Sequence, residues 1–228
     1  MREVRILLAA QIRLFPPDII PIRRLALDEP REAIRSIFKF QGAQPITRQE
    51  SIIGVNFTAG TYGPDAIVIP NVAIEERRIV VRVEGESKVA SSVYGEVRKK
   101  LEEFNNGRPI EEILCTHETV TSVVLDVPFD RLFSDSLLSF LRKSAIKHTK
   151  NKWSENLIVL SNLKFTVRYK VTDDTLIKNH FTLASKELAI EPREKSSPDD
   201  RLYWITSPTD TDTHFKLIGD LEKAFAEK

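Results

Sequence analysis

Alternation of apolar and polar residues along the chain predicts strands, and apolar residues at helical spacing predict helices. In the first half of the chain, strands are expected at residues 4–15, 52–58, 66–72 and 78–83. One helix is expected after Asp28, and a second begins at Ser87 and stops at Asn105-Asn106-Gly107. The first half therefore has the predicted order β-α-β-β-β-α.

The second half repeats this order. Strands are expected at residues 120–127, 157–171, 177–190 and 202–206, with helices at 134–148 and 212–226. Consecutive strands joined by short connections pair as antiparallel meanders, and the helices need an apolar sheet face to cover. The predicted fold is α+β, with residues 1–107 and 108–228 as two β-α-β-β-β-α units of one pseudo-symmetric molecule. The helices would cover one face of the antiparallel sheet and leave the other open.

Direct comparison of the chain with itself supports an internal repeat. At an offset of 124 positions, residues 51–104 align without a gap with residues 175–228. Arg77 meets Arg201, and Gly95 meets Gly219. The apolar residues of the two predicted last helices also coincide. We therefore expect a tandem duplication, which determines the architecture but does not identify a function.

Strand alternation also predicts which side chains occupy the open sheet face. In the strand at 157–171, Leu163, Phe165, Val167 and Tyr169 share one phase and are expected to be buried. The side chains of opposite phase in this strand, and those expected on the same face of the other predicted strands, are rich in basic and hydrogen-bonding groups. The predicted face comprises Arg5, Arg13, Asn56, Arg78, Arg82, Asn162, Lys164, Thr166, Arg168, Lys170, Lys178 and His180. Such a face suits phosphate contacts, but lysine and arginine also keep exposed strands soluble, so both interpretations stay open.

One local segment resembles a known family. Residues 78–88, with the sequence RIVVRVEGESK, and the following Val93-Tyr94-Gly95 resemble the last strand-to-helix passage of the TATA-box-binding protein family. The tandem order of elements is similar to that fold over most of the chain. The resemblance implies that two repeats form one curved sheet that sits on nucleic acid.

Composition limits the remaining possibilities. The chain has 228 residues, 41% of them hydrophobic, which is enough for one large domain or two fused half-domains. Its 34 basic and 33 acidic residues give a net charge of +1, so polyanion binding would require local segregation of charge. A second basic cluster follows the predicted central helix; the helix dipole explains it adequately, and a partner surface is the alternative. It comprises Arg142, Lys143, Lys147, His148, Lys150 and Lys152.

Catalytic motifs are not apparent. The sequence has no glycine-rich phosphate loop, nucleophile elbow or dinucleotide fingerprint. Cys115 and His117 fall on one side of an extended segment, without further metal-ligand residues nearby in the sequence. We therefore expect no catalytic residues, no metal and no cofactor. The single cysteine excludes an internal disulfide, and no apolar run approaches the ~18 residues of a membrane helix, so a cytoplasmic protein without a membrane partner is expected.

These observations predict a non-enzymatic binding protein. Its ligand would be nucleic acid or another polyanion on the open sheet face. The alternative is a protein-interaction or scaffold module, in which a homo-oligomer could form through a sheet edge. A small-ligand pocket between sheet and helices is a third alternative, and no convergent set of polar residues in the sequence supports it.

Overall fold

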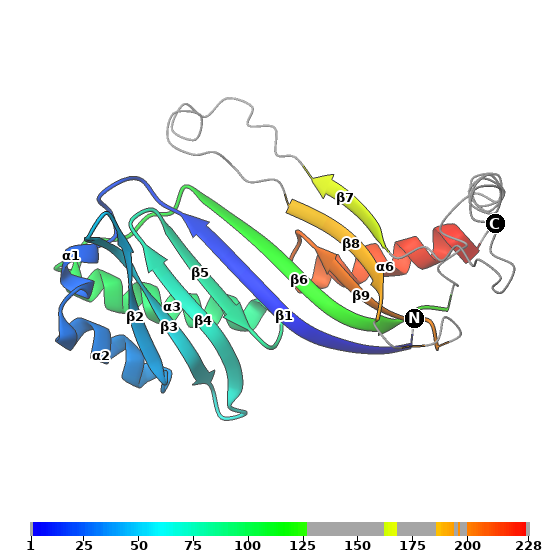
Figure 1. Cartoon of the computed structure of the whole chain (residues 1–228), viewed down its shortest axis with the longest axis horizontal. Helices are drawn as coiled ribbons and strands as arrows, with labels where there is room; N and C mark the ends of the chain where they lie inside the picture. Colours follow the sequence, from blue (N-terminus) through cyan, green and yellow to red (C-terminus); the bar gives the residue numbers. More distant parts are fainter. Residues whose placement is uncertain (1, 127–161, 168–185, 194–195, 197–199, 227–228) are drawn as a thin grey trace, which may run out of the picture.

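The computed structural model describes residues 2–126, 162–167, 186–193, 196 and 200–226. It shows an α+β protein built on one nine-stranded antiparallel sheet with the order β2-β3-β4-β5-β1-β6-β9-β8-β7. Four helices accompany the sheet in the described part of the chain. Two long strands, β1 and β6, pair with each other at the centre and curve across the molecule (Figure 1).

The first half contains more elements than the sequence predicts. Its strands are β1 (Arg2–Leu14), β2 (Gly42–Arg48), β3 (Ser51–Tyr62), β4 (Ile67–Glu75) and β5 (Arg78–Val83), and its helices are α1 (Ile22–Leu25), α2 (Asp28–Ile37) and α3 (Ser87–Phe104). The predicted order β-α-β-β-β-α is wrong here because it lacks β2 and α1. β2 is an edge strand without regular apolar alternation, and its Pro45 is tolerated there because an edge position needs no N–H on its free side.

The second half contributes β6 (Leu114–Val124), β7 (Leu163–Val167), β8 (Lys186–Pro192), β9 (Leu202–Ser207) and α6 (Thr211–Ala226). The predicted strand at 202–206 and the predicted last helix agree with β9 and α6 to within one residue. The helix predicted at 134–148 lies outside the described residues. So does the whole second basic cluster, Arg142, Lys143, Lys147, His148, Lys150 and Lys152.

The offset of 124 positions holds for part of the structure only. β5 and β9, and likewise the first residues of α3 and α6, stand 124 positions apart. In the first half, Val80 of β5 pairs with Ala73 of β4. Trp204 lies 124 positions after Val80, and its partner Glu191 lies only 118 positions after Ala73. The hairpin between β8 and β9 is therefore six residues longer than its counterpart. The ungapped alignment upstream of β5 is wrong for this reason.

The helix N-termini of the two halves meet each other directly. Ser87 N donates to Thr211 Oγ1 over 2.8 Å, and Thr211 N donates to Ser87 Oγ over 3.1 Å. A free backbone N–H in the first turn of a helix needs such an acceptor, and here each helix supplies the hydroxyl for the other. This reciprocal cap and the central β1–β6 pairing connect the two halves.

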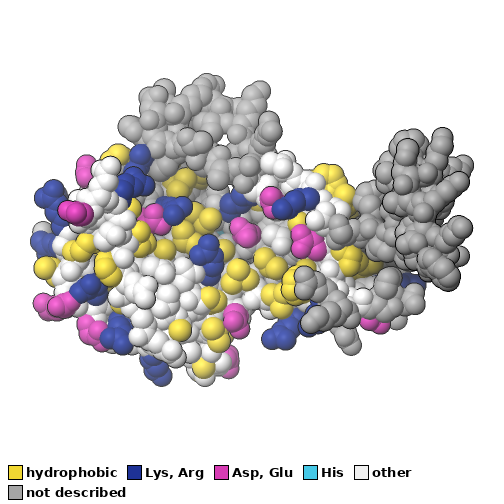
Figure 2. Space-filling model, in the orientation of Figure 1, with side chains coloured by type: hydrophobic (Ala, Val, Ile, Leu, Met, Phe, Trp, Pro, Cys, Tyr) yellow, Lys and Arg dark blue, Asp and Glu magenta, His cyan; other side chains and the backbone are white. Residues whose placement is uncertain are grey.

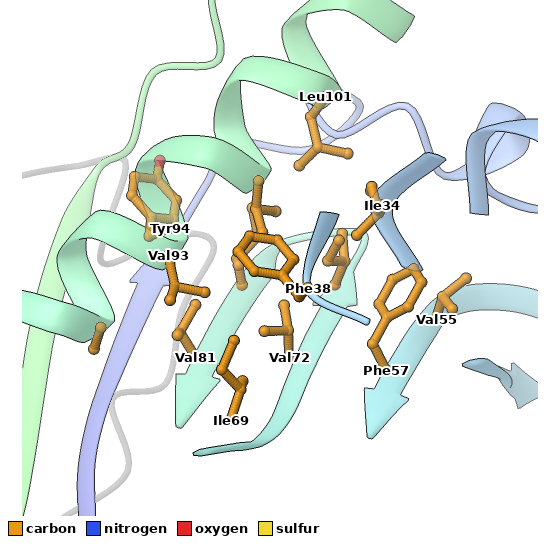
Figure 3. Packing of buried hydrophobic residues seen from close by; sticks show 14 of the residues in the cluster. Ile34, Phe38, Val55, Phe57, Ile69, Val72, Val81, Val93, Tyr94 and Leu101 are labelled. Carbon is orange, nitrogen blue, oxygen red and sulfur yellow. The ribbon is translucent and has the colours of Figure 1, made fainter. Parts of the chain in front are cut away.

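Each half has its own apolar core. The larger one packs the sheet against α2 and α3, with Ile34, Phe38, Phe57, Val81 and Leu101 fully or nearly fully buried (Figure 3). Burial of each such side chain stabilises the fold by roughly 1.5–3 kcal/mol. The smaller core gathers around α6 and comprises Val123, Leu125, Ile190, Tyr203, Ile205 and Ile218. Among the described helices, none is long and apolar enough to cross a bilayer.

Candidate functional site

The two faces of the sheet are defined by their relation to α3. Ile79, Val81 and Val83 of β5 belong to the core that contains α3, so Arg78 and Arg82 lie on the opposite face, termed the outer face. Strand pairing carries this assignment across the whole sheet. In Figure 1, α3 and α6 lie behind the strands, and the outer face is turned toward the reader.

Most of the described residues predicted for the open face do lie on the outer face. Strand phase places Arg5, Asn56, Arg78, Arg82, Lys164 and Thr166 there, and Asn162 is exposed just before β7. Arg168, Lys170, Lys178 and His180 lie outside the described residues. The predicted face is therefore described only in part.

The described part of this face has mixed charge. Lys164 Nζ lies 2.6 Å from Glu187 Oε2, and this carboxylate raises the pKa of the lysine by hydrogen bonding and by its charge. Arg78 pairs with Glu75 at 2.7 Å. Figure 2 shows basic and acidic side chains interspersed among apolar ones on the same face. In the residues that the structure describes, the predicted basic side chains therefore share the outer face with carboxylates that pair with two of them.

Arg82 differs from these paired residues. Its NH1 donates to Asn71 Oδ1 over 3.1 Å, and Asn71 Nδ2 donates to Asn56 Oδ1 over 3.0 Å. This cross-strand row of three side chains holds the guanidinium in place on the outer face. Within the described residues, Arg82 has no carboxylate partner.

Two predicted positions require correction. Arg13 lies on the inner face, where its guanidinium stacks on the ring of Tyr94 with its carbon 4.0 Å from the ring centroid. The register of β1 against β6 shifts between Ile6 and Leu8, and this β-bulge reverses the alternation for the rest of β1. Phe165, which strand alternation predicts to be buried, is 50% exposed on the edge strand β7.

A cluster of polar side chains lies on the inner face where β1, β6 and α3 meet. This junction cluster consists of Gln11, Arg13, Tyr94, Glu112, Cys115 and His117. Gln11 pairs across the strands with His117, and Arg13 with Cys115. Arg13 forms an ion pair with Glu112, and Cys115 Sγ lies 3.6 Å from His117 Nε2. The structure confirms that Cys115 and His117 share one side of their strand.

Burial shifts the pKa values of three groups in the junction cluster, Tyr94, Cys115 and His117, toward their neutral forms. It raises the pKa of the Cys115 thiol and lowers the pKa of His117. It also raises the pKa of Tyr94, and the Glu112 carboxylate adds to this effect. Lys186, whose pKa is likewise lowered by burial, donates from Nζ to the His117 carbonyl over 2.9 Å. Clusters of shifted groups are typical of functional sites, although structural networks also produce them.

Sequence reasoning missed the junction cluster because its members are far apart along the chain. The one sequence signal for this cluster was that Gln11 and Arg13 are polar, although they alternate in the same strand with the apolar residues Ala9 and Phe15. Among the described residues, no group of three or more histidine, cysteine, aspartate or glutamate side chains is arranged to hold a metal ion.

No protein-family model matches the chain, and no curated protein matches it.

Proposed function

We propose that the protein is a non-enzymatic binding protein whose outer face contacts a polyanion, with nucleic acid as the ligand class. The observation that carries this proposal is the fixed guanidinium of Arg82. Its position is held by the amide groups of Asn71 and Asn56, and it forms no ion pair with a carboxylate among the described residues. A cation held in advance loses less conformational freedom on binding than a mobile one, and arginine pairs strongly with phosphate.

The surroundings of Arg82 fit this role. Thr58 and Asn71 follow Arg82 in direct cross-strand register, so hydroxyl and amide groups lie beside the guanidinium. Arg5 is exposed on the same face opposite Ser122. The Thr58 hydroxyl and the Asn71 amide are uncharged, so they can bond phosphate oxygens without repelling the neighbouring guanidinium.

We propose further that the chain is a tandem duplication with its helices on one side of the sheet, similar to the TATA-box-binding protein fold. The common offset of β5 with β9 and of α3 with α6 supports this proposal. So does the reciprocal cap between Ser87 and Thr211. The open outer face is the surface that such a fold offers to an extended ligand.

A protein partner on the same face is the second candidate, and two observations favour it. Trp204 is 39% exposed on the outer face, and tryptophan is enriched in the binding hot spots of protein interfaces. Glu75 and Glu187 neutralise two of the basic residues there, which suits a partner of mixed charge better than a polyanion.

Fluorescence anisotropy with labelled single-stranded DNA, double-stranded DNA and RNA at several salt concentrations tests the proposal. We expect Arg82→Glu to weaken binding at least about tenfold and to lower the salt slope by about one unit, because it removes a phosphate contact. Arg23→Glu is the matched control, since Arg23 is an exposed residue of the helix α1 and not of a strand that carries the outer face.

Two results would contradict a nucleic-acid ligand. One is wild-type binding no tighter than the roughly 10⁻⁴ to 10⁻⁶ M typical of non-specific association. The other is an equal loss of affinity in Arg82→Glu and Arg23→Glu, which would show that only net charge matters. Either result leaves a protein partner as the better account of the outer face.

A further inference from the structure

The central strand β1 carries apolar side chains on both faces of the sheet. Ala9 and Phe15 are buried in the larger core on the inner face. The residues of the opposite phase are Leu8, Ala10, Ile12 and Leu14. An antiparallel sheet with water on one face normally alternates apolar and polar residues, whereas strands that are covered on both faces are apolar throughout. The sequence of β1 is therefore typical of a strand with a cover on its outer face as well.

The described helices cover the inner face only. α1, α2 and α3 contribute buried residues to the larger core and α6 contributes to the smaller one, and both cores lie on the inner face. On the outer face, Leu8 pairs with Val120 and Leu14 with Leu114, and these side chains and that of Ile12 are only half-buried. These five residues are termed the apolar stripe. Figure 2 shows apolar side chains among the charged ones on this face.

Two side chains of opposite charge flank β1 at the same register. Arg82 of β5 and Glu118 of β6 both pair with Ala10, so each lies one strand spacing, about 4.8 Å, to either side of β1. Neither side chain forms an ion pair within the described part of the chain. Burial lowers the pKa of Lys186 and the charge of Glu118 opposes this effect, yet the lysine donates to the His117 carbonyl.

A twofold axis parallel to β1 makes this arrangement self-complementary. Such an axis places the β5 side of one copy over the β6 side of a second copy, and β1 over β1. Arg82 of each copy then lies over Glu118 of the other, and the two apolar stripes face each other. Sheets that pack face to face lie about 10 Å apart with their strands within about 30°, so side chains fill the space between them. Arg5 is exposed and lies about 17 Å along β1 from Ala10, where its charge stays in water.

The outer face is large enough for such a pairing. Nine strands about 4.8 Å apart, with a length of about 20 Å, give a face of roughly 800 Å². A standard interface uses about 800 Å² of each partner. The remaining charges include Arg78 with Glu75 and Lys164 with Glu187, which neutralise each other within one copy. An apolar centre with a polar border is the usual composition of a protein interface.

We infer that the outer face pairs with the outer face of a second copy of this chain, with β1 against β1 around a twofold axis. This inference goes beyond the proposed function and concerns its regulation, because Arg82 would serve both partners. A polyanion and the second copy would therefore exclude each other on this face, and the dimer would keep the face closed until a polyanion competes for it.

Sedimentation velocity of the full chain over a wide range of concentrations tests the inference. We expect the wild type to form a dimer. Arg82→Glu and Glu118→Arg each place like charges over one another at two equivalent contacts, so each should weaken the dimer at least about tenfold. An equimolar mixture of the two variants should restore the dimer, because each variant supplies the charge that the other needs. Arg23→Glu is the control and should dimerise like the wild type, since Arg23 is an exposed residue of α1.

Three results would overturn the inference. They are a wild type that is monomeric at every concentration, a dimer that both charge variants retain, and a mixture of folded variants that stays monomeric. Circular dichroism and the thermal midpoint show whether each variant is folded. If a charge variant unfolds, Ile12→Thr takes its place, because it keeps a β-branched side chain while removing apolar area from the stripe. It should weaken the dimer severalfold, and an unchanged dimer would count against the inference.

Addition of single-stranded DNA separates this inference from the proposed function. We expect DNA to dissociate the dimer, since both need Arg82, and DNA bound to an intact dimer would contradict pairing through this face. A dimer that passes the mixing test but binds no nucleic acid would support the inference and contradict the proposed function. A monomeric wild type that binds DNA through Arg82 would do the reverse.

Discussion

At the scale of single residues, His214 stands out because it is an ionisable side chain that is fully buried outside the junction cluster. It is fully buried on α6, with Nε2 2.8 Å from Thr121 Oγ1 and Nδ1 2.7 Å from Ser207 Oγ. The two hydroxyls can satisfy both nitrogens of a neutral imidazole, since each can donate or accept. Burial lowers the pKa of His214 to about 4, so the ring is neutral in the folded protein at physiological pH.

This histidine predicts a loss of stability in acid. Its pKa is lower in the folded state than in the unfolded state, so the unfolded chain binds more protons between pH 6.5 and about 4. The free energy of unfolding should therefore fall as pH drops through this window, by roughly 3 kcal/mol at most. Urea unfolding at pH 7.5 and pH 5 measures the change. His214→Gln should be less stable at pH 7.5 yet much less sensitive to pH, and an unchanged pH dependence in this variant would contradict the assignment.

Individual residues also show where sequence reasoning stopped. Arg5 and Arg13 are both odd-numbered members of one strand, so simple alternation predicts one face for both. The bulge between Ile6 and Leu8 sends Arg5 to the outer face and Arg13 to the inner face. A single inserted residue has no signature in an apolar run such as Ile6-Leu7-Leu8. The junction cluster, which depends on that reversal, could therefore not be predicted.

At the scale of elements, predictability follows periodicity. β5, α3, β9 and α6 agree with their sequence predictions to within one residue, because their apolar positions keep one period from end to end. β2 was missed because Gly42 and Pro45 disfavour strands, and its pairing with β3 alone decides its conformation. Local propensity is overruled where a neighbouring strand supplies the hydrogen bonds.

Two glycines of these elements should respond oppositely to alanine. At Gly95, on the exposed side of α3, an added Cβ meets nothing within 4 Å, so Gly95→Ala should stabilise the protein by about 0.5–1 kcal/mol through helix propensity. At Gly60 in β3, the same Cβ would lie 2.5 Å from the Phe40 ring. Gly60→Ala should destabilise by roughly 1–3 kcal/mol through overpacking. Urea denaturation of both variants measures the difference, and a stabilising Gly60→Ala would contradict the packing described for β3.

Across the whole molecule, the connection between the halves is polar where each interior is apolar. Thr119, Thr121, Ser207 and Thr211 are all buried near the centre, between the two apolar cores. Thr119 Oγ1 donates to the Thr209 carbonyl over 2.8 Å. The reciprocal bonds between Ser87 and Thr211 cross from one half to the other, and directional bonds of this kind fix how the halves meet more narrowly than apolar contacts alone.

The reciprocal cap gives this connection a measurable energy. Ser87→Ala and Thr211→Ala each remove one acceptor and leave one buried N–H unpaired, so each should cost about 1 kcal/mol of unfolding free energy. The double variant should cost less than the sum, by about 0.5 kcal/mol or more, because loosening the contact once weakens the remaining bond. A double-mutant cycle in urea measures this coupling. Ser92→Ala, an exposed position of α3, is the control, and strict additivity at Ser87 and Thr211 would argue against a shared cap.

The proline of the edge strand limits how this protein can assemble. Pro45 gives β2 one donor fewer for a further strand, and Gln44 and Arg48 place polar and charged side chains along that border. Fibre growth by strand addition requires every subunit to be extended at both borders of its sheet. A subunit that resists extension at one of them can still form a closed pair elsewhere on its surface, but it is a poor building block for open-ended polymers.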